Sequence, residues 1–201
     1  MSPAAIDLCV YNAKLPETEK MQSYVLTGDP GFEKDNYAIT LGHLDKQNNV
    51  IVDLAVKFEP PLNIIKIENF YEDLCKRYNV VDVCLDKHLS MATIQRLYDI
   101  GLPSRGVSFG ARTDVKLYQN LLELVNVQKI KLPKCTYIYK GDVIEESDAL
   151  LTELKFLQRV VLADRYRVEA SPGHTDDLAD AVALLAYTLN VERRQGGEVL
   201  F

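Results

Sequence analysis

The order of strand-like and helix-like segments constrains this chain more than any other feature. Three runs rich in β-branched and aromatic residues come first, at 24–29, 37–42 and 50–56, and the short connections between them predict an antiparallel meander. After residue 63 the apolar residues recur at helical spacing, and helix-like and strand-like segments then alternate. This order predicts an α/β fold with a mixed sheet, three antiparallel strands followed by parallel strands, flanked by helices.

Further elements are expected along the rest of the chain. Helices are expected at 63–78, 90–100, 113–127, 148–157 and 175–191, strands at 80–86, 107–109 and 159–168, and a brief extended piece at 130–133. The last helix has the clearest apolar stripe, because Leu178, Val182 and Leu185 recur at successive turns. The acid-rich stretch 142–148 is expected to be a solvated loop.

Length and composition describe an ordinary globular chain. The 201 residues suffice for one domain, and 47% apolar with 26% charged residues excludes a disordered or collagen-like protein. No run approaches the ~18–20 apolar residues of a membrane helix, and no secretory signal is expected. We expect an arm or linker at 1–20, the folded domain at 21–195 and a C-terminal tail at 196–201.

The charge balance limits how the chain could bind nucleic acid. The chain has 23 Lys and Arg against 29 Asp and Glu, a net charge of −6, whereas proteins that bind DNA by phosphate neutralisation alone are usually basic. Contact with nucleic acid would therefore be local, metal-mediated or assisted by another chain. The four cysteines form no CxxC pair and have no histidine at zinc-ligand spacing, which disfavours a zinc site.

Acidic residues stand where the expected strands and the last helix could meet. Asp29 ends the first strand, Asp86 ends the fourth, and Asp177 and Asp180 share one face of the last helix. If the first and fourth strands are parallel neighbours, their ends meet at one sheet edge, and a helix beginning over that edge would bring three or four carboxylates together. Such carboxylates repel unless a cation neutralises them, and oxygen ligands suit Mg²⁺ or Mn²⁺. Two such ions roughly 3.5–4 Å apart can cleave a phosphodiester.

Simpler explanations exist for each acid taken alone. Acids in the first turn of a helix, including Asp176, complement the helix dipole. Asp29 precedes Pro-Gly, where an aspartate commonly forms a turn. The joint pattern is more specific than any of its parts, but at this level both explanations stay open.

Three short motifs give the chain a family resemblance. GDPG at 28–31, followed by DNYAI at 35–39, resembles the opening of the nuclease domain of large terminase subunits from tailed phages. VCLD at 83–86 is similar to the second acidic motif of that family, and GHTDDLADA at 173–181 to its late His-Asp-Asp motif. The resemblance covers about residues 22–190 and implies a ribonuclease H-like fold and a metal-dependent endonuclease.

The resemblance also implies site residues. Asp29, Asp86 and Asp177 would be the catalytic metal ligands for two Mg²⁺ or Mn²⁺ ions, with Asp180 and Asp176 as further candidate ligands. The groups expected to support the ligands or contact DNA are Asp35, His174, Lys87 and His88. By charge, Lys57, Arg105 and Arg112 are additional candidates for phosphate contacts.

The implied activity is cleavage of concatemeric double-stranded DNA with low sequence specificity, within a viral packaging motor in the host cell cytoplasm. The implied partners are double-stranded DNA, the terminase ATPase domain, the portal and the small terminase subunit, with no membrane. No GxxxxGK[ST] phosphate-binding loop is present, so the chain resembles the nuclease half alone. Two alternatives remain open: a Holliday-junction resolvase-like nuclease and a non-catalytic ribonuclease H-like module that docks proteins.

Overall fold

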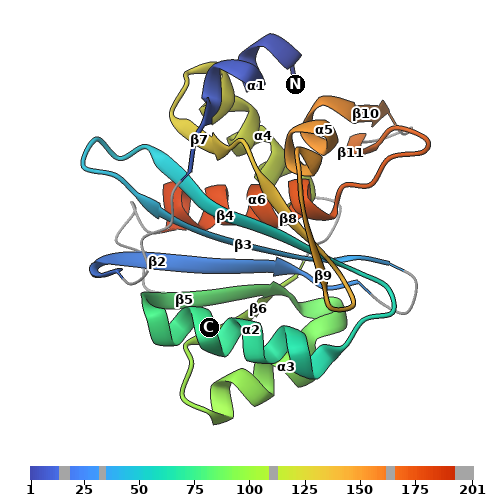
Figure 1. The fold of residues 1–201 in the computed structure, drawn as a ribbon. Helices are drawn as coiled ribbons and strands as arrows, with labels where there is room; N and C mark the ends of the chain where they lie inside the picture. Colours follow the sequence, from blue (N-terminus) through green and yellow to red (C-terminus); the bar gives the residue numbers. More distant parts are fainter. Residues whose placement is uncertain (14–18, 32–34, 109–112, 162–165, 193–201) are drawn as a thin grey trace.

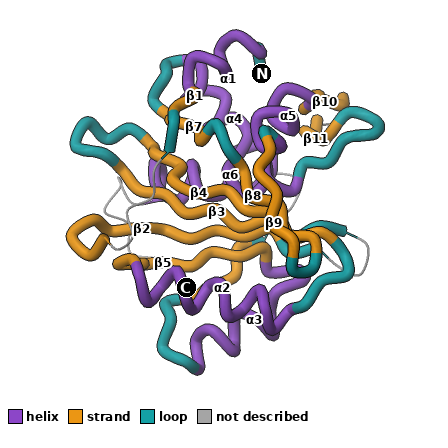
Figure 2. The backbone as a smooth tube through the Cα atoms, in the orientation of Figure 1, coloured by secondary structure: helices purple, strands orange, loops and turns teal. Residues whose placement is uncertain are grey.

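A mixed sheet organises the structure, a computed structural model that describes residues 1–13, 19–31, 35–108, 113–161 and 166–192 (Figures 1 and 2). Its strand order is β1-β7-β4-β3-β2-β5-β6, and β8 and β9 extend it beside β4. The strands are β1 (Val10–Tyr11), β2 (Glu19–Asp29), β3 (Tyr37–Leu44), β4 (Val50–Glu59), β5 (Tyr78–Asp86), β6 (Ser104–Val107), β7 (Ile130–Pro133), β8 (Thr136–Lys140) and β9 (Val143–Ser147).

The pairing confirms the expected mixed sheet. β2, β3 and β4 pair antiparallel as a meander, with Asp29 opposite Ala38 at the end of the first pair. The chain then crosses over through a helix, and β5 returns parallel to β2, with Gly28 opposite Leu85. β6 continues parallel on the outer side of β5. The first and fourth predicted strands are therefore neighbours that end at the same edge.

Helices cover both faces of the sheet. One face carries α1 (Pro3–Cys9), α4 (Thr113–Asn126), α5 (Ala149–Phe156) and α6 (Asp177–Tyr187), and the other carries α2 (Ile64–Arg77) and α3 (Lys87–Asp99) (Figure 1). Side chains alternate between two cores because successive strand residues point to opposite faces. Val25 and Ala38 contact the core under α6, whereas Leu26 and Ile39 contact the core over α2.

Several segments differ from the sequence-based expectation, and the strand expected at 107–109 lies at Ser104–Val107 as β6. The expected arm begins with α1, whose Ile6 and Cys9 lie three residues apart on one helical face and are fully buried in the α6 core. The expected loop at 142–148 contains β9, which pairs antiparallel with β8 around a turn at Gly141. The strand expected at 159–168 is a hairpin of β10 (Leu157–Val161) and β11 (Tyr166–Ala170).

The differences at α1 and β9 have a similar physical reason. A seven-residue helix is too short to show a clear period of apolar residues, and β9 is largely exposed. Neither element therefore has the apolar pattern from which secondary structure is predicted. The last helix also ends earlier than expected, at Tyr187, and a π-helical turn (Thr188–Glu192) follows it. No helix within the described ranges has the length and apolarity that a membrane crossing requires.

Candidate metal centre

Two aspartates lie at the carboxyl ends of neighbouring parallel strands. The last paired residues of β2 and β5 are Gly28 and Leu85, and Asp29 and Asp86 follow directly. Both aspartates are half-buried. The carboxyl edge of parallel strands is where α/β folds place their ligand sites, because the strand ends and the loops that follow them converge there.

Helix α6 begins over the same edge and is tied to the sheet by buried hydroxyls. Its first residue is Asp177, and one turn later the carbonyl oxygen of Ala181 accepts a hydrogen bond of 2.7 Å from the Thr27 hydroxyl. The hydroxyls of Thr27 and Thr40 are 2.6 Å apart, and both residues are fully buried. Because Thr27 lies two residues before Asp29, this contact sets the position of the helix relative to the strand that carries Asp29.

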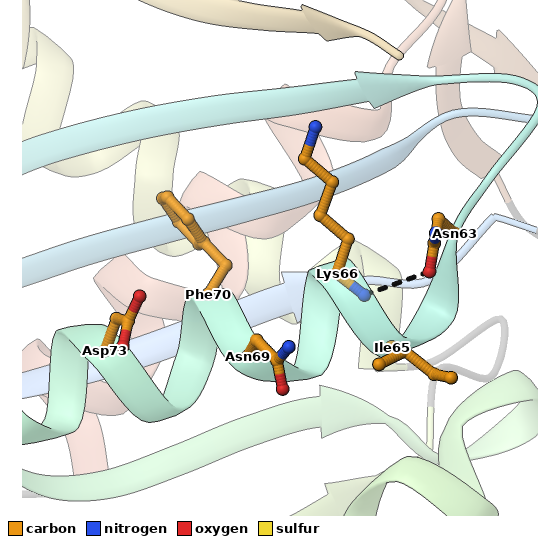
Figure 3. A pocket seen from close by; sticks show the side chains of 6 residues that line it. All are labelled: Asn63, Ile65, Lys66, Asn69, Phe70 and Asp73. Atoms are coloured by element: carbon orange, nitrogen blue, oxygen red, sulfur yellow. Dashed lines mark hydrogen bonds between the residues drawn. The ribbon is translucent and has the colours of Figure 1, made fainter. Parts of the chain in front are cut away.

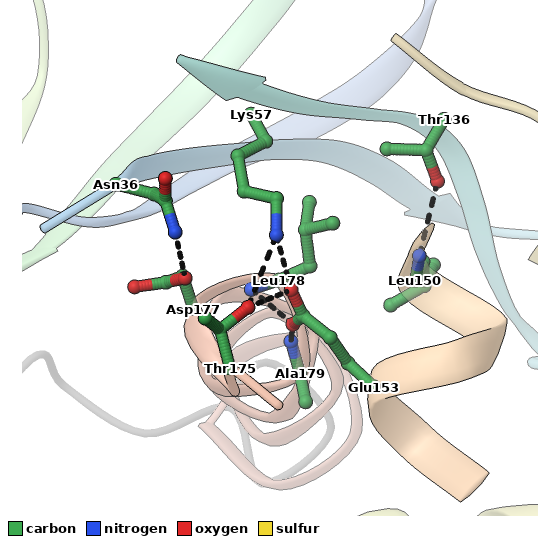
Figure 4. Close-up of polar contacts among 9 residues, drawn as sticks. All are labelled: Asn36, Lys57, Thr136, Leu150, Glu153, Thr175, Asp177, Leu178 and Ala179. Atoms are coloured by element: carbon green, nitrogen blue, oxygen red, sulfur yellow. Dashed lines mark hydrogen bonds and ion pairs between the residues drawn. The ribbon is translucent and has the colours of Figure 1, made fainter. Parts of the chain in front are cut away.

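The N-terminus of α6 is capped by a residue from another helix. The Glu153 carboxylate, from α5, accepts hydrogen bonds from the backbone N–H groups of Leu178 (2.8 Å) and Ala179 (3.1 Å) (Figure 4). The Asp176 side chain makes no cap and instead accepts a bond of 2.9 Å from the N–H of Ala170. The capping role that could have explained the acids of this helix is therefore filled by Glu153.

The acids at this edge interact electrostatically. Burial, together with the nearby charges of Asp180, Asp177, Asp86 and Asp176, raises the pKa of Asp29 to about 9. Burial also raises the pKa of Asp177, although the Asn36 hydrogen bond and the Lys57 charge oppose the shift. The other four acids predicted from the sequence thus all act on the Asp29 carboxyl group, which is protonated at neutral pH unless a cation replaces the proton.

Neighbouring donors hold the other carboxylates. Asn36 donates to Asp177 Oδ2 at 2.8 Å, and Tyr118, from α4, donates its hydroxyl to Asp180 Oδ1 at 2.6 Å. Among the described residues, no three Asp, Glu, His or Cys side chains stand together as a preformed set of metal ligands. The donor chemistry fits a hard divalent cation, because every candidate ligand is a carboxylate oxygen.

A cavity of about 370 Å³ opens beside these acids. Asp29, Asp176 and Asp177 line it, together with Asp35 and His174. The predicted positions at 35 and 174 are therefore at the site.

The exposed imidazole of His174 stacks on the Phe156 ring, with ring centroids 3.8 Å apart and an interplanar angle of 9°. Lys87 and His88 form the first turn of α3, directly after Asp86.

Two of the three basic residues suggested as phosphate contacts have other roles. Lys57 is only 7% exposed and pairs with Glu153, and Arg105 pairs with Asp82 and Glu192. Arg112 lies outside the described residues. The expectation of a phosphate contact is wrong for Lys57 and Arg105, because the Lys57 ammonium and the Arg105 guanidinium each pair with carboxylates within the protein.

A second hollow, of about 400 Å³, lies on α2 and contains no comparable cluster (Figure 3). Its lining consists of Asn63, Ile65, Lys66, Asn69, Phe70 and Asp73. The Asn63 side chain caps α2 there by accepting from the N–H of Lys66 at 3.0 Å. The chemistry of this hollow is therefore that of a helix surface, and the acid-lined cavity is the better site.

The sequence reasoning missed the residues that support the acids. Asn36 is 141 residues from Asp177 in sequence, and Tyr118 is 62 residues from Asp180. Glu153 and Thr27 bond the backbone of α6 at separations of 25 and 154 residues. The capping glutamate gave no signal, because a cap is recognised in sequence only when it lies next to its helix. Asn36 was within a quoted motif, next to Asp35.

Comparisons with known proteins support the fold. No protein-family profile and no curated protein sequence match this chain. Among solved structures, the large terminase nuclease from the thermophilic phage G20c superposes with a TM-score of 0.73 at 15% identity, covering 92% of this chain and 96% of that chain. The Thermus phage P74-26 large terminase nuclease domain gives 0.72 at 15% identity, covering 92% and 93%.

The nuclease domain of the large terminase from bacteriophage SPP1, solved with bound Mn, gives a TM-score of 0.57 at 14% identity and covers 86% of each chain. A form of the G20c nuclease was solved with bound magnesium. These likenesses confirm the expected architecture: over most of its length this chain has the ribonuclease H-like fold of terminase large-subunit nuclease domains.

Proposed function

We propose that this chain is a divalent-metal-dependent endonuclease that cuts double-stranded DNA with low sequence specificity. The observation that supports the proposal most is the acid cluster around Asp29, at the sheet edge where two parallel strands and α6 meet. A carboxyl group with four acidic neighbours is unfavourable in a metal-free protein, and such an arrangement is typical of a cation site.

In this mechanism Asp29, Asp86 and Asp177 would hold two Mg²⁺ or Mn²⁺ ions, with Asp180 and Asp176 as further ligands. The ions would supply charge neutralisation at the phosphodiester and activation of water. The chain's own residues orient the ligands: Asn36 holds one oxygen of Asp177, and Tyr118 holds one oxygen of Asp180.

The rim of the site supplies the contacts to the DNA backbone. His174 and Asp35 are exposed at the cavity, and Lys87 is exposed beside the end of β5. His88 follows Lys87 in the same turn. Contacts to phosphates position a duplex without reading its bases, which accounts for low sequence specificity.

The same proposal extends to the biological setting. We infer that the substrate is concatemeric viral DNA and that the chain works beside a terminase ATPase domain, the portal and the small terminase subunit in the host cytoplasm. The acidic net charge of −6 supports this arrangement, because partners would supply much of the attraction for DNA.

Conversion of supercoiled plasmid in Mg²⁺ or Mn²⁺ tests the proposal, with the Asp29→Asn variant and an EDTA control. We expect cleavage by the natural sequence, none in EDTA and none by D29N. The matched variant Asp73→Asn, on the solvent side of α2, should cut normally. Metal-dependent cleavage retained by D29N would refute the assignment. A strong preference for four-way junctions over linear duplex would favour a resolvase.

A further inference from the structure

A buried ion pair lies directly behind the acid cluster. Lys57 Nζ and Glu153 Oε1 are 2.6 Å apart, and their side chains are 9% and 5% exposed. Removing two charges from water costs several kcal/mol per ion, so a buried pair is weak evidence of a role in stability alone. The position of this pair therefore suggests a role other than stability.

Glu153 joins three elements through its two carboxylate oxygens. Oε1 accepts from Lys57 Nζ, from β4, and at 2.8 Å from the Thr175 hydroxyl. Oε2 accepts from the first free N–H groups of α6, at Leu178 and Ala179. Figure 4 shows these groups converging beside Asp177. The carboxylate therefore fixes the start of the helix that carries two of the candidate ligands and follows a third, Asp176.

Lys57 contacts the segment just before Asp177 and interacts electrostatically with the Asp177 carboxylate. Lys57 Nζ also lies 3.1 Å from the Thr175 hydroxyl, two residues before Asp177. The ammonium charge is one of the two main influences that oppose the burial-driven rise in the pKa of Asp177, together with the Asn36 hydrogen bond. A cation in the site and the ammonium of Lys57 would thus both attract the Asp177 carboxylate.

We propose that Glu153 and Lys57 are positioning residues of the metal site: Glu153 caps α6 and engages the Lys57 ammonium, which leaves the Asp177 carboxylate available to a divalent cation. This inference rests on the proposed function, since it concerns the same site. It gives α5 and β4 a role in metal binding, although neither element carries a candidate metal ligand.

Substituting each residue of the ion pair should change the Mn²⁺ affinity differently. In Glu153→Gln the amide oxygen still accepts from the helix N–H groups, but Lys57 loses its carboxylate and turns to Asp177. We expect Mn²⁺ to bind about tenfold more weakly, within the 10–100-fold cost of losing a residue that supports metal ligands. In Lys57→Met the competing ammonium is gone and the Glu153 cap remains. We expect Mn²⁺ affinity equal to or higher than that of the natural sequence.

Calorimetric titration with Mn²⁺ alone measures the affinity, and thermal unfolding in EDTA measures the stability of each variant without metal. Both variants lose the same ion pair, so both should unfold at lower temperature. A purely structural pair predicts weaker Mn²⁺ binding in both variants, which would overturn the inference. Should E153Q fail to fold, Lys57→Met decides alone, because weaker binding by that folded variant contradicts the proposal.

Glu68→Gln provides a matched control. Glu68 is 6% exposed and pairs with Arg96, but it lies on α2, on the opposite face of the sheet. This variant should lose stability and keep its Mn²⁺ affinity. If the natural sequence binds no Mn²⁺, the proposed function fails together with this inference; if it binds and E153Q binds equally well, only this inference fails.

Discussion

Asp29 makes the metal-free protein sensitive to pH. Its pKa is about 9 in the folded chain, mainly because of burial and secondarily because of its four acidic neighbours, against an ordinary value of 3.8. A group whose pKa rises on folding contributes stability that is complete below its unfolded pKa and disappears as pH rises through its folded pKa. In EDTA, Asp29 therefore lowers the free energy of unfolding progressively between about pH 4 and pH 9.

The first prediction isolates this effect by comparison with Asp29→Asn. Other groups also titrate in this range, so we predict the difference between the two proteins: the natural sequence loses up to about 1 kcal/mol per pH unit relative to D29N between pH 5 and pH 8. Urea unfolding in EDTA at four pH values measures it. Asp35→Asn, at an exposed position, should follow the natural sequence. A constant difference across this range would contradict the prediction.

Gly28, the residue before Asp29, has no room for a side chain. A Cβ there would lie 2.1 Å from the Tyr71 hydroxyl oxygen, 2.8 Å from Leu85 Cδ2 and 3.3 Å from the carbonyl oxygen of Ala38. Tyr71 and Leu85 are fully buried, so neither can move aside cheaply. We predict that Gly28→Ala costs roughly 1–3 kcal/mol in urea unfolding, the usual cost of overpacking a core. A loss of less than about 0.5 kcal/mol in the free energy of unfolding would show that the sheet shifts to accommodate the added Cβ.

At the scale of elements, a hydroxyl relay fastens α6 to β2 and β3. Thr27 donates to Ala181 O at 2.7 Å, and Thr40, 3.3 Å from the same oxygen, has the Thr27 oxygen at 2.6 Å as its better acceptor. Each valine substitution keeps the side-chain shape and removes one hydroxyl. We predict that Thr27→Val costs about 1–2 kcal/mol in unfolding experiments and Thr40→Val less, because Thr27 keeps its bond to the helix in the second variant. Equal costs would contradict the relay direction.

Helix α1 belongs to the core under α6. Ile6 is fully buried, and the Cys9 thiol lies 3.6 Å from the carbonyl oxygen of Val125 in α4. We predict that Ile6→Ala lowers the free energy of unfolding by about 2–5 kcal/mol, the usual cost of truncating a buried isoleucine. Leu8→Ala, at a position 61% exposed on the same helix, should change it by less than about 0.5 kcal/mol. Similar small effects for both would mean that α1 is an arm after all.

For the whole molecule, the sequence predicts what depends on local pattern. The meander, the crossover to β5 and the long helices follow from apolar periodicities that burial imposes, and the acids at the strand ends and the start of α6 follow from those elements. The nearness of Asp29 and Asp86 then required only that β2 and β5 be parallel neighbours, which their pairing confirms.

What the sequence could not predict depends on tertiary contact. Glu153 caps a helix 24 residues further along the chain, and Thr27 reaches a carbonyl 154 residues away, so neither contact leaves a local signal. The sequence presents Lys57 as a candidate phosphate contact, and only its burial beside Glu153 reveals its partner. Exposed β9 lacks the pattern by which strands are recognised, because only its backbone is constrained by pairing.

Competition between a proton and a metal ion for Asp29 should also change the thermal stability of the whole chain. A divalent cation at the cluster must displace the proton of Asp29, so Mn²⁺ affinity should rise with pH, by up to about tenfold per unit below pH 9. At a hundred times its dissociation constant, bound Mn²⁺ adds about 2.7 kcal/mol, which raises the unfolding temperature of a chain this long by roughly 5–10 °C. We therefore predict that the temperature gain from a fixed Mn²⁺ concentration grows from pH 6 to pH 8. Thermal unfolding with Mn²⁺ and with EDTA at each pH measures the gain, and a gain that is constant or shrinks with pH would mean that the metal does not displace the proton of Asp29.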